Sequence, residues 1–388
     1  MPFTGECGEL ARFLVVHLKL DTFGGAERVC HHILKTLIEH DQEVELLSFA
    51  FDRNKYRKMI GEEIPRNVTV HELHDRFNIA PPFTIYKEYF LAKKVLSKFK
   101  ERLNSKYDFI FLTQASNPFE LNFLTGIYNR SIGYVHFPEI HFEYDRSGLG
   151  RKTYLWLFKY YIEKGVSKLN WIICNSFYTR EMITKYWGKH NTKNTTVIYP
   201  PVDLDAFWCT KSFDKREKRV VYIGRFTPGK GHKTMKDLAE NFPEVEFISI
   251  GALTKDKKRW FEDLSANAPR NYLLKPNLPR TDLIRILQNS KIYIHLMKGE
   301  HFGIAPIEAL ASGCIVLVHD SGGAREYIPR MFRWKNFDDL KSKLSYFIEI
   351  DEKWWSSHRD YLWQKIMKFN SSRFSDEIWQ YLKGIIEN

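Results

Sequence analysis

The chain has 388 residues, of which 44% are hydrophobic and 27% charged, as in a globular protein of two or three domains. Its longest apolar runs, such as residues 315–318, have the length of a strand rather than of a membrane-spanning helix, and no signal peptide is expected. The net charge of +12 favours anionic partners, yet no zinc-finger, RNP or helix-turn-helix signature accompanies it, so nucleic acid is not expected as a partner.

The first half of the chain alternates strands and helices. Residues 12–18 read as a buried strand, a glycine turn follows at Gly24–Gly25, and apolar residues at helical spacing begin at Ala26. Residues 43–49 form the next strand, which completes a βαβ unit and predicts a parallel sheet. Further strands of this half are predicted at residues 107–112, 131–136, 171–175 and 196–199.

The same pattern recurs in the second half. A strand at residues 219–224 leads through a Pro/Gly turn into a helix from His232, and more strands are predicted at residues 245–250, 291–296 and 314–319. The predicted fold class is therefore α/β, with two Rossmann-like domains, residues 1–202 and 203–371, whose parallel sheets face a central cleft. The sequence leaves open whether the C-terminal helix, residues 372–388, packs back on the first domain.

The five cysteines, an odd number without a CxxC pair, argue against a disulfide framework and favour a reducing, cytosolic setting. They are Cys7, Cys30, Cys174, Cys209 and Cys314.

Residues 224–231 (GRFTPGKG) come between a strand and a helix and nearly match a P-loop. Gly231 replaces the Ser or Thr that would hold magnesium, which speaks against an NTPase. Arg225 and Lys230 remain as two cations near one turn, and such a pair suits a diphosphate. The alternative is two solvated basic residues.

Residues 300–313 (EHFGIAPIEALASG) are the most specific feature of the chain. Pro306 suits the first turn of a helix and Gly313 its C-terminal cap. Glu300 then lies in a loop at a strand's carboxyl end, while Glu308 lies among small apolar neighbours. A carboxylate in such surroundings needs polar partners, either sugar hydroxyls or an internal salt bridge.

Weaker candidates also follow strands. Gly24–Gly25 and the turn at residues 320–323 (DSGG) each open a predicted helix, as an anion site or simply as a tight turn. His136 ends a strand, where it suits a ligand or a structural role. Asp203 and Asp205 form a DxD, which we interpret as coincidental because it falls in the stretch between the domains. No metal site is expected.

Together these residues resemble glycosyltransferase family 4, retaining enzymes of the GT-B fold. The resemblance is carried in order by Gly24-Gly25-Ala26-Glu27, His136-Phe137-Pro138, Asn175-Ser176, residues 199–203 (YPPVD), Gly224-Arg225 with Lys230-Gly231, the segment from Glu300 to Glu308, and Ser321-Gly322-Gly323. The variant HFGI with SGG looks like the α-mannosyltransferases that extend lipid-linked oligosaccharides at the cytosolic face of a membrane.

The resemblance implies roles for particular residues. Arg225 and Lys230 would hold the donor diphosphate, and Glu308 would bind the ribose hydroxyls. Glu300, with Phe302 and the backbone at Gly303 and Ile304, would hold the transferred sugar, His136 would reach it from the other domain, and Gly24 and Gly25 would let amides approach the phosphate. Residues 1–202 would then bind the acceptor and residues 203–371 the donor, with no cofactor and no metal.

The expected reaction moves mannose from GDP-mannose to a lipid-linked saccharide. A UDP-sugar donor and a non-catalytic scaffold are the alternatives. Peripheral membrane association is expected through residues 86–106 or 151–168, which combine basic and aromatic residues. Residues 275–279 (KPNLP) stand where the family usually has a Gly-containing strand end near the base.

Overall fold

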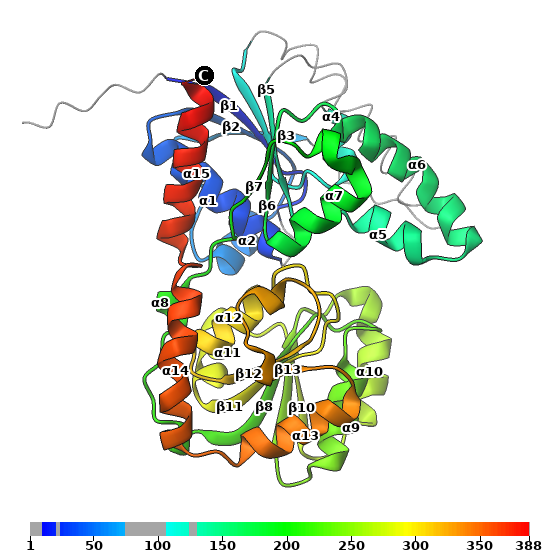
Figure 1. Ribbon diagram of the computed structural model, residues 1–388, viewed down its shortest axis with the longest axis vertical. Coiled ribbons are helices and arrows are strands. Elements are labelled where there is room, and N and C mark those ends of the chain that lie inside the picture. The colour runs from blue at the N-terminus through cyan, green and yellow to red at the C-terminus, as the bar shows by residue number, and fades with distance from the viewer. Residues whose placement is uncertain (1–9, 21–23, 74–105, 124–129, 388) are drawn as a thin grey trace, which may run out of the picture. The chain divides into compact units, whose positions relative to one another are not determined.

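The computed structural model describes residues 10–20, 24–73, 106–123 and 130–387, and the chain divides into two compact units (Figure 1). Unit 1 comprises Met1–Pro201 and Ser372–Asn388, and unit 2 comprises Val202–Ser371. Each unit is built on its own sheet of parallel strands flanked by helices. The predicted fold class, two α/β domains with parallel sheets, is confirmed.

The described part of unit 1 contains a seven-stranded sheet in the order β3-β2-β1-β4-β5-β6-β7. The strands are β1 (Arg12–Val16), β2 (Glu43–Phe49), β3 (Thr69–Leu73), β4 (Phe109–Leu112), β5 (Arg130–Val135), β6 (Trp171–Cys174) and β7 (Thr195–Val197). The helices are α1 (Gly25–Glu39), α2 (Arg53–Ile60), α4 (Pro118–Phe123), α5 (Glu139–Arg146), α6 (Leu149–Val166), α7 (Phe177–Asn191) and α15 (Ser371–Ile386).

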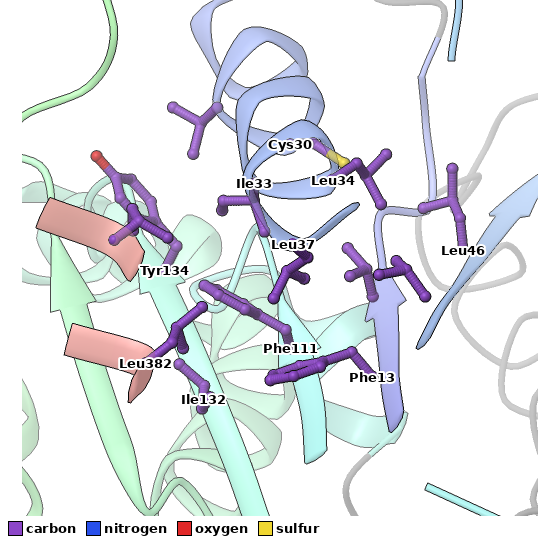
Figure 2. Close-up of a cluster of buried hydrophobic side chains, with 14 of the residues drawn as sticks. Phe13, Cys30, Ile33, Leu34, Leu37, Leu46, Phe111, Ile132, Tyr134 and Leu382 are labelled. Atoms are coloured by element: carbon purple, nitrogen blue, oxygen red, sulfur yellow. The ribbon is translucent and has the colours of Figure 1, made fainter. Parts of the chain in front are cut away.

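Alternate residues of β1 serve two cores, because successive side chains of a strand point to opposite faces of the sheet. Phe13 packs in a cluster with α1 and α15, which Figure 2 shows around Ile33, Leu37 and Leu382. Leu14 and its neighbours pack on the other face, against α4, α6 and α7. The C-terminal helix thus belongs to the core of unit 1 through four residues at helical spacing: Phe374, Ile378, Leu382 and Ile385.

Unit 2 contains a six-stranded sheet in the order β10-β9-β8-β11-β12-β13. Its strands are β8 (Glu217–Ile223), β9 (Glu246–Gly251), β10 (Tyr272–Pro276), β11 (Ser290–His295), β12 (Ile315–His319) and β13 (Arg333–Trp334). Its helices are α8 (Leu204–Phe207), η1 (Phe213–Lys215), α9 (His232–Asn241), η2 (Lys255–Lys257), α10 (Lys258–Ala266), α11 (Arg280–Gln288), α12 (Ile304–Ala311), η3 (Gly323–Glu326), η4 (Arg330–Phe332), α13 (Phe337–Ile348) and α14 (Glu352–Met367).

The strand order reverses direction between β1 and β4 in unit 1 and between β8 and β11 in unit 2. In open parallel sheets, ligands bind beyond the carboxyl ends of the strands at such a switch point. The loops that follow β8 and β11 carry the most specific sequence motifs, so the topology brings those motifs to one edge of one sheet.

Sequence reasoning missed β3, β10 and β13. The first two are only partly buried and carry polar residues such as Glu72 and Lys275, and β13 has two residues. The helix expected from Ala324 was wrong, because that segment is the four-residue 3₁₀ helix η3. Of the two basic aromatic segments, residues 86–105 lie outside the described residues.

Candidate functional site

Several packing contacts and hydrogen bonds fix the loop between β8 and α9. Gly231, the N-cap of α9, has a φ of 80°, and a Cβ there would lie 2.7 Å from Cβ of Leu296, just beyond β11. Nε2 of the buried His232 donates a hydrogen bond to the carbonyl of Arg225 at 3.0 Å. The carbonyl of Lys230 accepts a hydrogen bond from the hydroxyl of Tyr222. These contacts fix the path of the loop against the end of β11.

The two cations of this loop are available to a ligand. Arg225 is exposed and Lys230 is half-buried, and neither makes an ion pair within the part of the chain that the structure describes. Other basic side chains of unit 2 do face an acid, as Lys218 faces Glu349 at 2.8 Å. Unpaired cations on an ordered loop at a strand end suit an anion such as a diphosphate.

Glu300 is held on both of its oxygens. Its Oε2 lies 2.9 Å from Nε2 of His295, the last residue of β11, and its Oε1 accepts the amide of His301 at 3.0 Å. Nδ1 of His295 in turn lies 3.1 Å from the hydroxyl of the buried Tyr293. Burial raises the pKa of the Glu300 carboxyl, but the hydrogen bond and charge of His295, followed by His301, outweigh it and lower the pKa to about 2. Glu300 is therefore a fixed, ionised acceptor.

The start of α12 is set by Gly303 and Tyr327. Gly303 has a φ of 92°, which favours glycine, and the hydroxyl of the buried Tyr327 donates to the carbonyls of both Phe302 and Gly303 at 2.8 Å. Pro306 lies in the first turn of α12. The backbone of Gly303 and Ile304 therefore lies next to Glu300 in a fixed geometry.

Glu308 is buried in the middle of α12, as its apolar neighbours predict. The helix ends as predicted: Gly313 has a φ of 83°, its amide donates to Leu310 at 3.0 Å, and the amide of Cys314 donates to Ala309 at 3.0 Å, the pattern of a Schellman cap. The indole of Trp363 on α14 donates to the carbonyl of Leu310 at 2.9 Å, which anchors α12 from outside.

The Ser321-Gly322-Gly323 turn supports the Glu300 loop. The amide of Gly323 donates to the carbonyl of Glu300 at 2.7 Å, and the hydroxyl of Ser321 accepts the amide of Gly299 at 2.8 Å. A Cβ on Gly322 or Gly323 would collide with the backbone of residues 299–302. The Gly323 amide is already used within the protein, which favours a packing role over an anion site at this turn.

In unit 1, three side chains meet beyond β1, β4 and β5. Nδ1 of His17 lies 2.7 Å from Oγ1 of Thr113, and Nε2 of His136 lies 3.0 Å from the Thr113 carbonyl. Burial, followed by the charge of His136, lowers the pKa of His17 to about 3, so His17 is neutral. Gly24 caps α1 in an extended conformation that any residue adopts, and a Cβ there would lie 3.0 Å from a carboxyl oxygen of Glu27.

The predicted residues fall into two groups, each at the carboxyl edge of its own sheet. Arg225, Lys230, Glu300 and the residues 302–304 and 308 belong to unit 2, and Gly24, Gly25 and His136 belong to unit 1. Sequence reasoning missed His17, His295 and Tyr327. His295 had a signal, since it ends a strand two residues after Tyr293 on the same face, five residues before Glu300.

The DxD motif is structural in unit 2. Asp203 caps α8 by accepting the amide of Ala206 and pairs with Arg280 at 2.8 Å. Within the described residues, no group of three or more His, Cys, Asp or Glu side chains is arranged to hold a metal ion. The four described cysteines, Cys30, Cys174, Cys209 and Cys314, are free thiols.

Solved structures show the architecture to be that of the GT-B glycosyltransferases. Sucrose-phosphate synthase from Thermosynechococcus elongatus superposes with a TM-score of 0.80 at 14% identity, covering 97% of this chain and 99% of that one. Anabaena Alr3699/HepE, solved in complex with UDP and glucose, gives a TM-score of 0.73 at 16% identity, with 96% and 100% covered. At these identities the likeness concerns the fold.

Two glycosyltransferase family models match successive parts of the chain. The description "Glycosyltransferase Family 4" matches residues 23–206, and "Glycosyl transferases group 1" matches residues 210–341. The predicted class of enzyme is thereby confirmed: the protein is a glycosyltransferase.

Several curated relatives share the name GDP-Man:Man(3)GlcNAc(2)-PP-Dol alpha-1,2-mannosyltransferase. The Dictyostelium discoideum relative is 24% identical over 427 residues, covering 94% of this chain and 82% of the relative. The Caenorhabditis elegans relative is 24% identical over 356 residues, covering 78% and 74%. The human relative is 30% identical over 192 residues, and that alignment spans 44% of this chain but only 38% of the relative.

Proposed function

We propose that the protein transfers mannose from GDP-mannose to a hydroxyl of a lipid-linked saccharide, with retention of the anomeric configuration and without a metal ion. The observation that carries the proposal is that two cations, which make no ion pair within the described residues, and a fixed carboxylate lie at one switch point. The shared name of the curated relatives supports mannose as the sugar, GDP as the nucleotide and a lipid-linked oligosaccharide as the acceptor.

In the proposed reaction, Arg225 and Lys230 hold the diphosphate of the donor. The bond between the anomeric carbon and the phosphate oxygen breaks, and negative charge builds up on the leaving diphosphate. Preorganised cations stabilise such a charge, and the loss of one such group typically costs about 3 kcal/mol in the transition state. The acceptor hydroxyl forms the new bond from the same face, and its proton passes to the leaving phosphate.

The sugar and the ribose are held by the two carboxylates. Glu300, ionised and bonded to His295 and to the amide of His301, accepts hydrogen bonds from sugar hydroxyls. Glu308 accepts them from the ribose, with residues 302–304 lining the sugar. We assign His136 and the Gly24–Gly25 turn of unit 1 to the same reaction. An acceptor anchored in a lipid would bring the enzyme to the cytosolic face of a membrane as a peripheral protein.

A transfer assay tests the donor and the acceptor. The purified chain is incubated with labelled GDP-mannose and a detergent-solubilised polyprenyl-diphosphate oligosaccharide, with UDP-glucose and other UDP-sugars as parallel donors. We expect α-linked mannose in the lipid fraction, unchanged by EDTA. Transfer from a UDP-sugar alone would refute the GDP-mannose assignment, and loss of transfer with EDTA would refute the metal-free mechanism.

Nucleotide binding tests the place of the site. At about 100 times its dissociation constant, a ligand stabilises the fold by roughly 2.7 kcal/mol, which a thermal unfolding experiment reads easily. We expect the shift with GDP, not with UDP or ADP, and expect Glu308→Ala to lose it. The matched control is Glu349→Ala, an exposed carboxylate of unit 2 paired with Lys218. A shift that survives Glu308→Ala would place the ribose elsewhere.

A further inference from the structure

Helix α6 carries apolar side chains on two opposite faces. One face is buried in unit 1 against α4 and α5, where a Cβ on Gly165 would lie 2.6 Å from Cβ of Leu121. The buried residues of that face include Leu155, Phe158 and Ile162. Figure 1 shows α5 and α6 on the side of unit 1 that faces away from α1 and α15, in agreement with the division of the core into two clusters. Packing on one face therefore fixes the orientation of the other.

The opposite face exposes Leu149, Trp156 and Tyr160, whose exposed fractions are 83%, 59% and 41%. These residues are seven and four positions apart, so at 3.6 residues per turn they lie in one line along the helix. The rings of Trp156 and Tyr160 stack at 6.2 Å with an interplanar angle of 18°. We call these three residues the α6 stripe. Exposed apolar residues that line up in this way mark a contact surface.

Basic side chains without acidic partners surround the α6 stripe. Lys164 lies over the ring of Tyr160 at 4.6 Å, and Lys152 lies over the ring of Tyr144 at 5.7 Å. Lys168 is exposed just beyond the end of the helix. None of these three lysines makes an ion pair within the residues that the structure describes, whereas Lys159 pairs with Glu163 at 2.6 Å. The charge left over around the stripe is therefore positive.

From this combination we infer that the α6 stripe and the lysines around it dock the enzyme on an anionic lipid surface. Aromatic rings with a polar edge, such as Trp156 and Tyr160, occupy the level of the lipid headgroups, while lysines reach phosphate groups with their flexible stems. None of the helices in the described part of the chain has the length and hydrophobicity to cross a bilayer. Docking through one helix face needs no such segment.

Charge complementarity favours lipid over a protein partner. An anionic leaflet attracts each nearby lysine with a free energy that corresponds to about fivefold in binding, and three lysines together to about 100-fold. The apolar part of the stripe is short, which suits insertion to the depth of the headgroups. The inference rests on the proposed function only to explain why the enzyme meets a membrane. The docking surface itself is inferred from the exposed side chains of α6 and the lysines near them.

Vesicle flotation tests the inference without donor or acceptor. The full chain is mixed at low salt with vesicles of phosphatidylcholine alone or with 30% phosphatidylserine, about the anionic share that gives a strong surface potential. We expect flotation only with the anionic vesicles. Trp156→Glu combined with Leu149→Glu should lower the binding constant for the anionic vesicles more than tenfold, and the triple change of Lys152, Lys164 and Lys168 to Ala should lower it about 100-fold.

The matched control is Tyr361→Glu combined with Met367→Glu, because both residues are exposed on α14 of unit 2, at 55% and 49%. The control should float like the wild type, and all variants should keep the thermal unfolding midpoint, since only exposed or half-buried surface side chains change. Flotation of the stripe variants at the wild-type level would overturn the inference. So would a wild-type dimer that the stripe changes convert to a monomer, because the stripe would then bind a second copy.

The transfer assay separates this inference from the proposed function. With acceptor in detergent, the stripe and lysine variants should transfer mannose at the wild-type rate, whereas transfer to acceptor in anionic vesicles should fall with the bound fraction. A chain that floats but transfers nothing in either setting would refute the proposed function and leave the docking surface standing. A chain that transfers normally in detergent but never floats would support the proposed function and refute the docking surface.

Discussion

The Nε2 atom of His295 lies 2.9 Å from Oε2 of Glu300, and both side chains are largely buried beyond the end of β11. The other ring nitrogen of His295 contacts the hydroxyl of Tyr293, so the imidazole is fixed from both sides. The hydrogen bond to His295 therefore fixes the orientation of the carboxylate that is proposed to hold the sugar. The strand sets it through His295.

His295 should accordingly act as a positioning residue. We expect His295→Ala to lower kcat/KM for the donor by about 10- to 100-fold, the range that corresponds to losing a hydrogen bond to a charged group. His295→Gln, which keeps a donor near Oε2 but no charge, should recover part of the loss. An acidic limb should appear in the pH profile of the Ala variant, because only His301 then opposes the effect of burial and the pKa of Glu300 rises.

The control for this pair is His358→Ala, since His358 stacks on Trp354 at 3.9 Å and its ring nitrogen contacts Ser357 and Trp354, all on α14. It should leave kcat/KM and its pH profile unchanged. A purely structural His295 would lower the unfolding temperature and kcat together while leaving the pH profile as in the wild type. That result would contradict the positioning role.

The lowered pKa of Glu300 predicts how stability changes in acid. The folded pKa is about 2 and the usual value 4.5, so the contribution is complete above pH 4.5 and is lost as the pH falls toward 2. The shift corresponds to roughly 3 kcal/mol. Denaturant unfolding of the wild type and of Glu300→Gln between pH 2 and 6 measures it. The difference between the two curves should grow across that window, and a flat difference would contradict the prediction.

Arg225 and Lys230 should matter more than other cations of the same region. Arg225→Ala and Lys230→Ala should each lower kcat about 100-fold, by removing a charge that stabilises the leaving diphosphate. Arg225→Lys should recover little of the loss if Arg225 grips two oxygens at once. Lys233→Ala, an exposed lysine in the first turn of α9, is the matched control and should stay within twofold of wild type. Equal losses for Lys233 and Lys230 would mean a general effect of charge.

The local pattern of the chain was enough to predict the βαβ units and the two carboxylates. Strands such as β1 and β11 are continuous runs of buried residues, and Pro306 and Gly313 delimit α12. Those signals act over a few residues, so a single sequence displays them.

The contacts that shape the site join residues far apart along the chain. Tyr327 reaches the carbonyls of Phe302 and Gly303 from some 25 positions away, and Gly323 donates to Glu300 across a turn. A sequence shows Ser321-Gly322-Gly323 as a glycine turn before a helix, which suggests an anion site. The supporting role depends on the contact between this turn and the Glu300 loop, and a sequence does not display that contact.

The hydroxyl of Tyr327 gives a direct test of that support. Tyr327→Phe leaves the carbonyls of Phe302 and Gly303 buried without their shared donor, which should cost about 1–3 kcal/mol of unfolding free energy. The loop at Gly303 should loosen, so KM for the donor should rise more than kcat falls. Tyr346→Phe on α13, an exposed tyrosine of unit 2, is the control for the loss of a hydroxyl. A donor KM unchanged in Tyr327→Phe would show that the loop keeps its shape without the bond.

Asn277 supports the loop of Arg225 and Lys230 from the end of β10, two strands away from β8 in the sheet. It follows β10 with a φ of 54°, a conformation that asparagine tolerates better than alanine does. Its amide donates to the carbonyl of Gly251 at 2.9 Å, and its Oδ1 accepts the amide of Leu253 at 3.0 Å. Gly251 in turn packs directly on the backbone of Gly224, which leads into Arg225.

Asn277→Ala should therefore cost about 1–2 kcal/mol, the combined effect of a strained backbone and one lost hydrogen bond. Asn277→Gly relieves the strain and loses only the side-chain bond, so it should be the more stable of the two. Denaturant unfolding gives the order, and the thermal shift with GDP should weaken in the same order, because the support reaches Arg225 through Gly251 and Gly224. Asn267→Ala, at the end of α10, serves as the control. Equal stability of the alanine and glycine variants would mean that the backbone at residue 277 carries no strain.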